Sequence, residues 1–258
     1  MRCRFRLLHT IIAERRRAVK MENCADVCYT DRKSAQAPAR GMERGFAMRK
    51  KERAEGVVAA LEAAYPGAVC ALHFQADYQL MIAVRLSAQC TDARVNLVTP
   101  ALFAAYPTLH AFAQADVADV ERLVHSCGFY QHKARDIVLA CQMLERDFGG
   151  RVPDTMEDLL KLPGVGRKTA NLLLGDLYGK EAYVCDTHCI RIAGRLGLTD
   201  GTKDPLKCEL QLRKLIPPEK SSDFCHRIVL HGRAVCTARS PRCGECTLAP
   251  YCRSFTGK

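Results

Sequence analysis

The sequence has no long apolar segment. Its uninterrupted apolar runs, such as 57–61 and 172–174, are far shorter than the roughly 20 residues that a membrane-spanning helix needs, which excludes such a helix. A leader with an apolar core and a small-residue cleavage site is also lacking, which argues against secretion. Strict alternation of apolar and polar residues, the pattern of a half-buried strand, is absent, and no segment repeats at a fixed period.

The composition is that of a soluble, well-packed globular protein. Of the 258 residues, 48% are hydrophobic and 26% are charged. The formal net charge of +11 favours a polyanionic partner. Charge alone does not distinguish nucleic acid from an acidic membrane surface, so the motifs must identify the class of partner.

The fifteen cysteines are unevenly placed. Eleven are scattered along the chain, and four lie within seventeen residues at positions 236, 243, 246 and 252. Because no secretory leader is present, a reducing compartment is the better expectation, and the compact group indicates a metal site rather than disulfides. The other cysteines, including those at positions 90, 185 and 189, have no ligand spacing, and we interpret them as small buried thiols.

Residues 1–47 differ in character from the rest of the chain. They hold eleven of the 39 Lys and Arg but only five of the 28 Asp and Glu, with an arginine triplet at 15–17 and a turn-prone stretch at 35–41. This pattern predicts a basic, disordered extension. It could be a phosphate-binding arm or a targeting peptide. We favour a solvated tail, or upstream sequence read from a mis-assigned start, because Met42 and Met48 are both possible starts.

From Met48 onward the apolar pattern is helical. In 57–65, apolar residues recur at three- and four-residue spacing until Pro66 and Gly67 stop the helix. The sequence therefore predicts an all-α fold of about ten helices. The further predicted helices, bounded by Gly, Pro or Asp/Thr caps, cover 77–90, 92–105, 116–126, 132–148, 155–162, 167–178, 187–196, 204–215 and 221–232.

A glycine-containing hairpin joins two of these helices at 162–170, with the sequence LPGVGRKTA. Gly164 and Gly166 allow a tight turn with exposed backbone amides at the start of the next helix. Such amides, with Arg167 nearby, would form a site for one phosphate oxygen of a DNA backbone without regard to base sequence. The alternative is that the glycines only make a turn.

This hairpin, continued through Asn171, resembles that of the helix-hairpin-helix DNA glycosylases, and specifically of the endonuclease III family. Two further stretches carry the resemblance, LSAQCTD at 86–92 and VCDTH at 184–188, together with the terminal cysteines. The resemblance implies two helical lobes with a DNA-binding cleft between them. One would be a six-helix bundle over 70–180 containing the hairpin, and the other an iron–sulfur cluster domain built from 48–69 and 181–258.

Lys168 and Asp186 are the candidate catalytic residues. A lysine in the first turn of a helix meets the positive end of the helix dipole, which favours its neutral, nucleophilic form, although a solvated phosphate-binding lysine is the alternative. Asp186 is placed to cap the helix that follows it, which is worth about 1 kcal/mol. The resemblance makes Lys168 the nucleophile on a sugar C1′ and Asp186 its electrostatic and acid–base partner. For His188, structural, phosphate-contacting and catalytic roles remain open.

An enzyme that attacks C1′ must extrude the nucleotide and fill the gap that it leaves. By resemblance, Gln89 occupies the vacated space. Phe129 stands where the family usually has a leucine wedge; an aromatic ring there can stack on the opposite base, but the departure leaves the opposing-base preference open.

The terminal cysteines Cys236, Cys243, Cys246 and Cys252 have the spacing C-x6-C-x2-C-x5-C. Four thiolates suit zinc or a [4Fe–4S] cluster, and spacing alone does not choose between them. The resemblance favours a [4Fe–4S] cluster with a structural role. Arg239 and Arg242 lie inside the loop and are predicted to face DNA phosphates once the cluster folds it.

The resemblance thus implies a bifunctional DNA glycosylase and apurinic/apyrimidinic lyase that removes oxidised pyrimidines from duplex DNA in base excision repair. Its partner would be double-stranded DNA with a damaged base or abasic site, and we expect a cytoplasmic, nucleoid-associated monomer. One alternative is a monofunctional mismatch glycosylase of the adenine-removing type, against which Lys168 and the lack of a further C-terminal domain argue. The other is a non-catalytic iron–sulfur protein that binds DNA or carries electrons, which only an activity measurement distinguishes.

Overall fold

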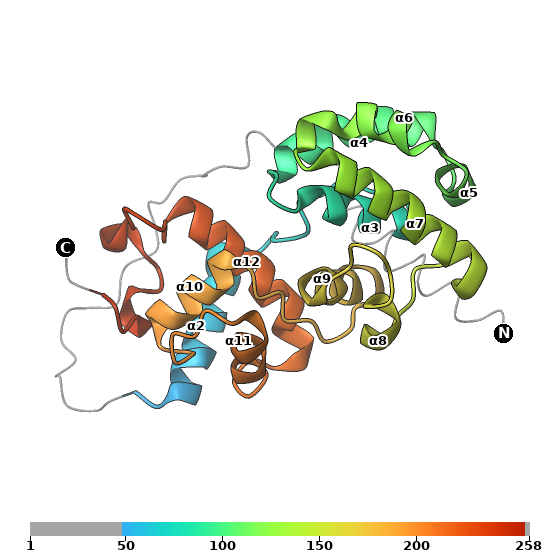
Figure 1. Ribbon diagram of the computed structural model, residues 1–258. Coiled ribbons are helices and arrows are strands. Elements are labelled where there is room, and N and C mark those ends of the chain that lie inside the picture. The colour runs from blue at the N-terminus through green and yellow to red at the C-terminus, as the bar shows by residue number, and fades with distance from the viewer. Residues whose placement is uncertain (1–47, 256–258) are drawn as a thin grey trace. The chain divides into compact units, whose positions relative to one another are not determined.

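A computed structural model describes residues 48–255, and the extension predicted over 1–47 lies outside the described residues, as do the last three. Within 48–255 the chain is helical and contains no strand, which confirms the all-α prediction (Figure 1). The α-helices are α2 (Lys50–Ala64), α3 (Asp77–Ser87), α4 (Asp92–Ala105), α5 (Leu109–Ala113), α6 (Val117–Val124), α7 (Tyr130–Phe148), α8 (Met156–Leu159), α9 (Arg167–Tyr178), α10 (Thr187–Leu196), α11 (Pro205–Leu212) and α12 (Ser221–Ala234). Short 3₁₀ turns are η1 (His125–Cys127), η2 (Pro218–Lys220), η3 (Cys243–Glu245) and η4 (Ala249–Tyr251).

Four helices end earlier than their sequence patterns predict, those expected over 77–90, 116–126, 155–162 and 204–215, and one helix is new. The helix predicted over 77–90 ends at Ser87, because Gln89 has a left-handed φ of 53° that a right-handed helix does not tolerate. The helix predicted over 155–162 shrinks to the four residues of α8. Helix α5 was not predicted, since five residues are too few to show an apolar stripe; its one local signal is Thr108, whose side chain caps the amide of Ala111.

The buried side chains form two hydrophobic cores. Helices α3 to α9 supply the first, with Leu80, Leu102 and Leu144 fully buried in it. Helices α2 and α10 to α12 supply the second, around Tyr183. Leu172 on α9 packs against both cores, so the helix that follows the hairpin lies at their junction.

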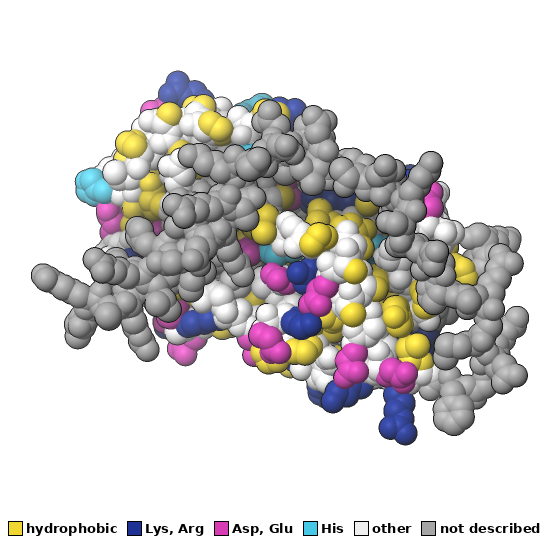
Figure 2. Space-filling model, turned by 180° about the vertical axis from the view of Figure 1, so that it is seen from behind, with side chains coloured by type: hydrophobic (Ala, Val, Ile, Leu, Met, Phe, Trp, Pro, Cys, Tyr) yellow, Lys and Arg dark blue, Asp and Glu magenta, His cyan; other side chains and the backbone are white. Residues whose placement is uncertain are grey.

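None of the described helices is both long and apolar enough to cross a membrane. On the face that Figure 2 presents, acidic and basic side chains lie close together over the described part of the surface.

Candidate functional site

The hairpin is the turn between α8 and α9. Gly166 is the N-cap residue of α9, and Gly164 has a φ of +73°. A Cβ at Gly164 would lie 2.5 Å from Nε of Arg85 and 2.8 Å from Oδ2 of Asp136. These two side chains are themselves joined by a 2.8 Å hydrogen bond between α3 and α7. Both the backbone conformation and the available space therefore require glycine at position 164.

The side chain of Arg167, predicted to add charge near a phosphate, is bonded to a carboxylate in this structure. Its Nε and Nη2 donate to the two carboxylate oxygens of Glu209, at 2.7 and 2.8 Å. Glu209 is 2% exposed, and it also accepts hydrogen bonds of 3.1 Å from Arg213. The guanidinium of Arg167 instead ties the start of α9 to α11. The sequence carries no local signal for this pair, because its members are 42 residues apart.

Glu209 is expected to stabilise the fold at neutral pH. Burial opposes its ionisation, but the ion pairs with Arg167 and Arg213 outweigh burial and lower its pKa. Glu209→Gln should therefore lower the free energy of unfolding by about 3 kcal/mol near pH 7, the low end for a broken buried pair because both guanidiniums are partly solvated.

A carboxylate whose pKa is lowered in the folded state stabilises the protein above its ordinary pKa of 4.5, and this contribution disappears as the pH falls through the lowered value. The difference between wild type and Glu209→Gln in urea unfolding should accordingly shrink at acidic pH. Glu181→Gln is the matched control, because this carboxylate pairs with the same Arg213 but is 38% exposed, and its loss should cost under about 1 kcal/mol. An equal loss in both variants would contradict the assignment.

Lys168 and Asp186 lie at the starts of two successive helices, α9 and α10. Lys168 is exposed in the first turn of α9, directly after the hairpin. Asp186 is half-buried and caps α10, with Oδ1 accepting a 2.8 Å hydrogen bond from the amide of Cys189. The predicted capping role of Asp186 is therefore confirmed, and its second carboxylate oxygen is left for another partner.

His188 lies within electrostatic reach of both Lys168 and Asp186. Burial lowers the pKa of His188, Asp186 opposes this shift, and Arg191, Arg233 and Lys168 add to it. Its Nδ1 is 3.2 Å from Nη2 of Arg191. These surroundings favour the neutral form of the His188 imidazole, and both Lys168 and Asp186 contribute to its electrostatic environment.

Gln89 and Phe129 line one cleft in the part of the chain that forms the first core. Among residues 48–255 they are the two non-glycine residues with positive φ, 53° and 47°. Both line a cleft of about 240 Å³ together with Arg85, His132 and Lys133. Phe129 is 63% exposed, which is a large apolar surface for a side chain at a loop tip. Non-glycine residues in left-handed conformation concentrate at functional sites.

The terminal cysteine loop is anchored to the helices beside it. Arg195 on α10 donates to Sγ of Cys236 at 3.3 Å and to the carbonyl of Thr237 at 2.8 Å. Sγ of Cys246 is 3.4 Å from Nε2 of the buried His231. The two arginines that hold this loop, Arg191 and Arg195, were not singled out by the sequence; their i,i+4 spacing on α10 was the available signal.

The four cysteines fit an iron–sulfur cluster as a donor set. All four are half-buried and free. Burial, and then the neighbouring thiols at 236, 252 and 243, raise the pKa of Cys246 to about 11. Four cysteine sulfurs are the ligand set that a [4Fe–4S] cluster takes, so these side chains fit that group in kind. Arg239 in this loop is exposed. Arg242 is exposed too, but its guanidinium contacts the carbonyl of Ala234 at the end of α12 and lies 3.5 Å from Glu245, so it joins the loop to that helix.

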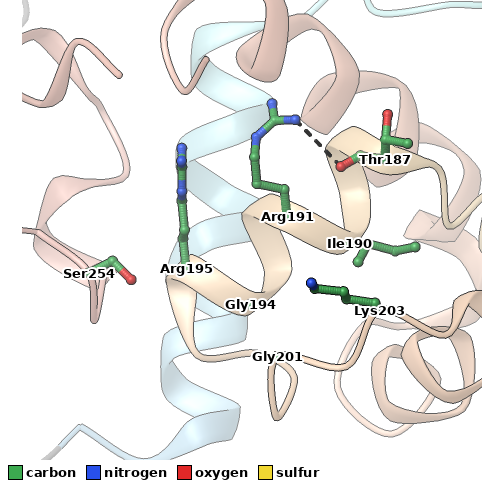
Figure 3. A pocket seen from close by; sticks show the side chains of 8 residues that line it. All are labelled: Thr187, Ile190, Arg191, Gly194, Arg195, Gly201, Lys203 and Ser254. Carbon is green, nitrogen blue, oxygen red and sulfur yellow. Dashed lines mark hydrogen bonds between the residues drawn. The ribbon is translucent and has the colours of Figure 1, made fainter. Parts of the chain in front are cut away.

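A groove of about 540 Å³ runs between α10 and the C-terminal segment (Figure 3). Arg191 and Arg195 rise from the same side of α10 in this view, and Lys203 lies across from them. The remaining described cysteines are buried or partly exposed, but Cys185, Cys189 and Cys208, which the sequence did not link, have sulfur atoms within 4.8 Å of one another. Those at 127, 141, 185, 189, 208 and 225 are buried, those at 70 and 90 are partly exposed, and those at 3, 24 and 28 lie outside the described residues.

Protein-family models match most of the described chain. The family described as "HhH-GPD superfamily base excision DNA repair protein" matches residues 82–218, and the "iron-sulfur binding domain of endonuclease III" matches residues 236–252. The second match covers the four terminal cysteines from first to last, in agreement with the [4Fe–4S] prediction.

Individual proteins agree with these matches. Endonuclease III of Synechocystis sp. is 51% identical over 206 residues, which are 80% of this chain and 94% of that protein. Endonuclease III of Bacillus subtilis is 40% identical over 73% of this chain and 86% of its own length. A solved structure of a non-covalent endonuclease III–DNA complex superimposes with a TM-score of 0.76 at 40% identity, covering 80% of this chain and 96% of that one. A chain with this hairpin, this cysteine loop and these relatives belongs to the endonuclease III family of the HhH-GPD superfamily of base excision DNA repair proteins.

Proposed function

We propose that the protein is a bifunctional DNA glycosylase and apurinic/apyrimidinic lyase that removes oxidised pyrimidines from duplex DNA. The observation that carries this proposal is the placement of Lys168 and Asp186 at the starts of α9 and α10, within electrostatic reach of His188, with Lys168 directly beside the hairpin. Among the structural relatives is a trapped endonuclease III–DNA covalent intermediate, 40% identical to this chain, which supports a covalent route.

The chemistry follows from an amine next to a carboxylate. The neutral Nζ of Lys168 attacks C1′ of the damaged nucleotide, and the base departs with the electrons of the glycosidic bond and a proton. Asp186 stabilises the positive charge that develops on the sugar and accepts or returns protons around the lysine. The resulting iminium acidifies C2′, so loss of a C2′ proton expels the 3′ phosphate, and water then releases the lysine from the sugar.

The other site residues hold the duplex open and in place. Gln89 and Phe129, beside one cleft, insert where the extruded nucleotide was and against the opposite base. Amides at Gly164 and Gly166 bind a backbone phosphate at the positive end of α9, and Arg239 adds a phosphate contact from the cysteine loop. We assign His188 a supporting role, because its Nδ1 is already hydrogen-bonded to Arg191.

The two hydrophobic cores support a division into two lobes, 70–180 and 48–69 with 181–258, and DNA would lie between them. Cys236, Cys243, Cys246 and Cys252 would hold a [4Fe–4S] cluster whose contribution is to fix the terminal loop. We further propose that the protein acts as a monomer in association with the nucleoid.

Borohydride trapping tests the proposal. The purified protein is incubated with a duplex that carries one thymine glycol or one abasic site, and with an undamaged duplex as control. A covalent adduct and strand cleavage on the two damaged duplexes alone are expected. Base release without an adduct would instead favour a monofunctional glycosylase, and binding without either product would favour a non-catalytic DNA-binding protein.

A further inference from the structure

Lys133 is a buried lysine that none of the assigned roles uses. It lies in the first turn of α7 and is 1% exposed. Its Nζ donates one 2.8 Å hydrogen bond to the carbonyl of Leu86 and another to the carbonyl of Cys127. Burying an ammonium group is costly unless its hydrogen bonds compensate for lost hydration, so its two acceptors are the key to what it does.

Both acceptors are carbonyls at the C-terminal ends of helical segments. Leu86 is in the last turn of α3, and Cys127 is the final residue of η1. Carbonyls at such ends have no acceptor role within their own helix, and the negative end of a helix dipole attracts a cation. The ammonium group of Lys133 therefore joins the ends of two helical segments whose bonded residues are 41 positions apart in the sequence.

Each of these ends leads at once into a residue with left-handed backbone. Gln89 follows Leu86 by three residues, and Phe129 follows Cys127 by two. Lys133, Gln89 and Phe129 then line the same cleft of about 240 Å³. Lys133 is hydrogen-bonded to the residues that begin both of these loops, Leu86 and Cys127. Its side chain therefore sets the distance between Gln89 and Phe129.

We infer that Lys133 is a positioning residue, which holds the loops of Gln89 and Phe129 at the separation that lets both enter the duplex together. This inference rests on the proposed function and deepens it. Preorganisation of this kind matters only when a duplex must be opened and its gap filled. A single-stranded oligonucleotide with an abasic site has no opposite base to displace, so its cleavage by Lys168 needs no paired insertion.

The test compares two substrates in the iron-loaded, full-length protein. Lys133→Met keeps the length of the side chain and removes the donors. We expect the single-turnover rate on a thymine glycol duplex to fall about tenfold or more, while cleavage of the single-stranded abasic oligonucleotide stays within about twofold. Lys161→Met is the matched control, since Lys161 is an exposed lysine paired with Asp158 near the hairpin, and both of its rates should stay unchanged. An equal loss on both substrates, or no loss on the duplex, would overturn the inference.

A double-mutant cycle separates positioning from general stability. With Gln89→Ala and Phe129→Ala already present, Lys133→Met should have little further effect on the duplex rate, because the lysine acts through those two side chains. The same fold-loss in both backgrounds would refute the inference.

Should Lys133→Met fail to fold by circular dichroism, Lys133→Arg takes its place. The bulkier guanidinium keeps the charge but displaces the two carbonyls. We expect the rate on the duplex to fall while the rate on the single-stranded oligonucleotide is kept. If both rates change by the same factor relative to wild type, Lys133 is not a positioning residue. If wild type cleaves neither substrate, it is the proposed function that fails.

Discussion

Replacing Lys168 with alanine is expected to eliminate the borohydride-trapped adduct and to lower lesion cleavage by a thousandfold or more, on the order of 4 kcal/mol of transition-state stabilisation. The reason is that no iminium forms without the primary amine, so both base excision through C1′ and β-elimination lose their covalent intermediate. The side chain is exposed and lies beyond the tight turn at Gly164, so its truncation should leave no cavity. Duplex binding should persist, because the hairpin amides are backbone groups.

Lys180→Ala is the matched control for this experiment. Lys180 follows the far end of α9 and pairs with Asp154 at 2.7 Å, so it tests the loss of a positive charge near the same helix. Its cleavage rate should remain within about twofold of wild type. A trapped adduct that persists in Lys168→Ala would mean that another amine is the nucleophile, and the assignment of Lys168 would then be abandoned.

Replacing Cys243 with alanine is expected to remove the iron–sulfur cluster and to loosen the terminal loop. Cys243 begins η3 and is one of four half-buried thiols, so the remaining three cannot complete the ligand set. Binding of a metal centre contributes directly to folding free energy. If at least about 3 kcal/mol is lost, the thermal midpoint should fall by roughly 10 °C, since 1 kcal/mol shifts a domain of this size by roughly 2–4 °C. Iron content and visible absorbance report the cluster, and a thermal melt reports the stability.

Cys141→Ala provides the comparison, because Cys141 is fully buried in the first core and far along the chain from the loop. This variant should keep its full iron content while losing about 1 kcal/mol for the cavity. Full iron content in Cys243→Ala would rule that cysteine out as a ligand. Affinity for duplex DNA should also fall in Cys243→Ala, because Arg239 would no longer be held in the folded loop.

The features that the sequence alone predicted depend on residues close together in the chain. Apolar spacing of three and four residues predicted nearly all of the helices, and the glycines at 164 and 166 predicted the tight turn before α9. Asp186 was identified as a helix cap from the residues that follow it, and the cysteine spacing identified the terminal loop as a ligand set. Each of these patterns is local, so its physical consequence can be worked out without knowing the fold.

The tertiary structure alone decided which distant side chains meet. It paired Arg167 with Glu209, and it brought Gln89 and Phe129 to one cleft. It also buried Lys133 against the carbonyls of Leu86 and Cys127. It placed Arg195 against Cys236, the first cysteine of the terminal loop. Hydrogen-bonding and charged groups satisfy one another only once packing has fixed their positions, and a charged residue has many chemically equivalent partners along the chain. For this protein the sequence by itself therefore determined the kinds of element and their chemistry, and packing decided the pairings between them.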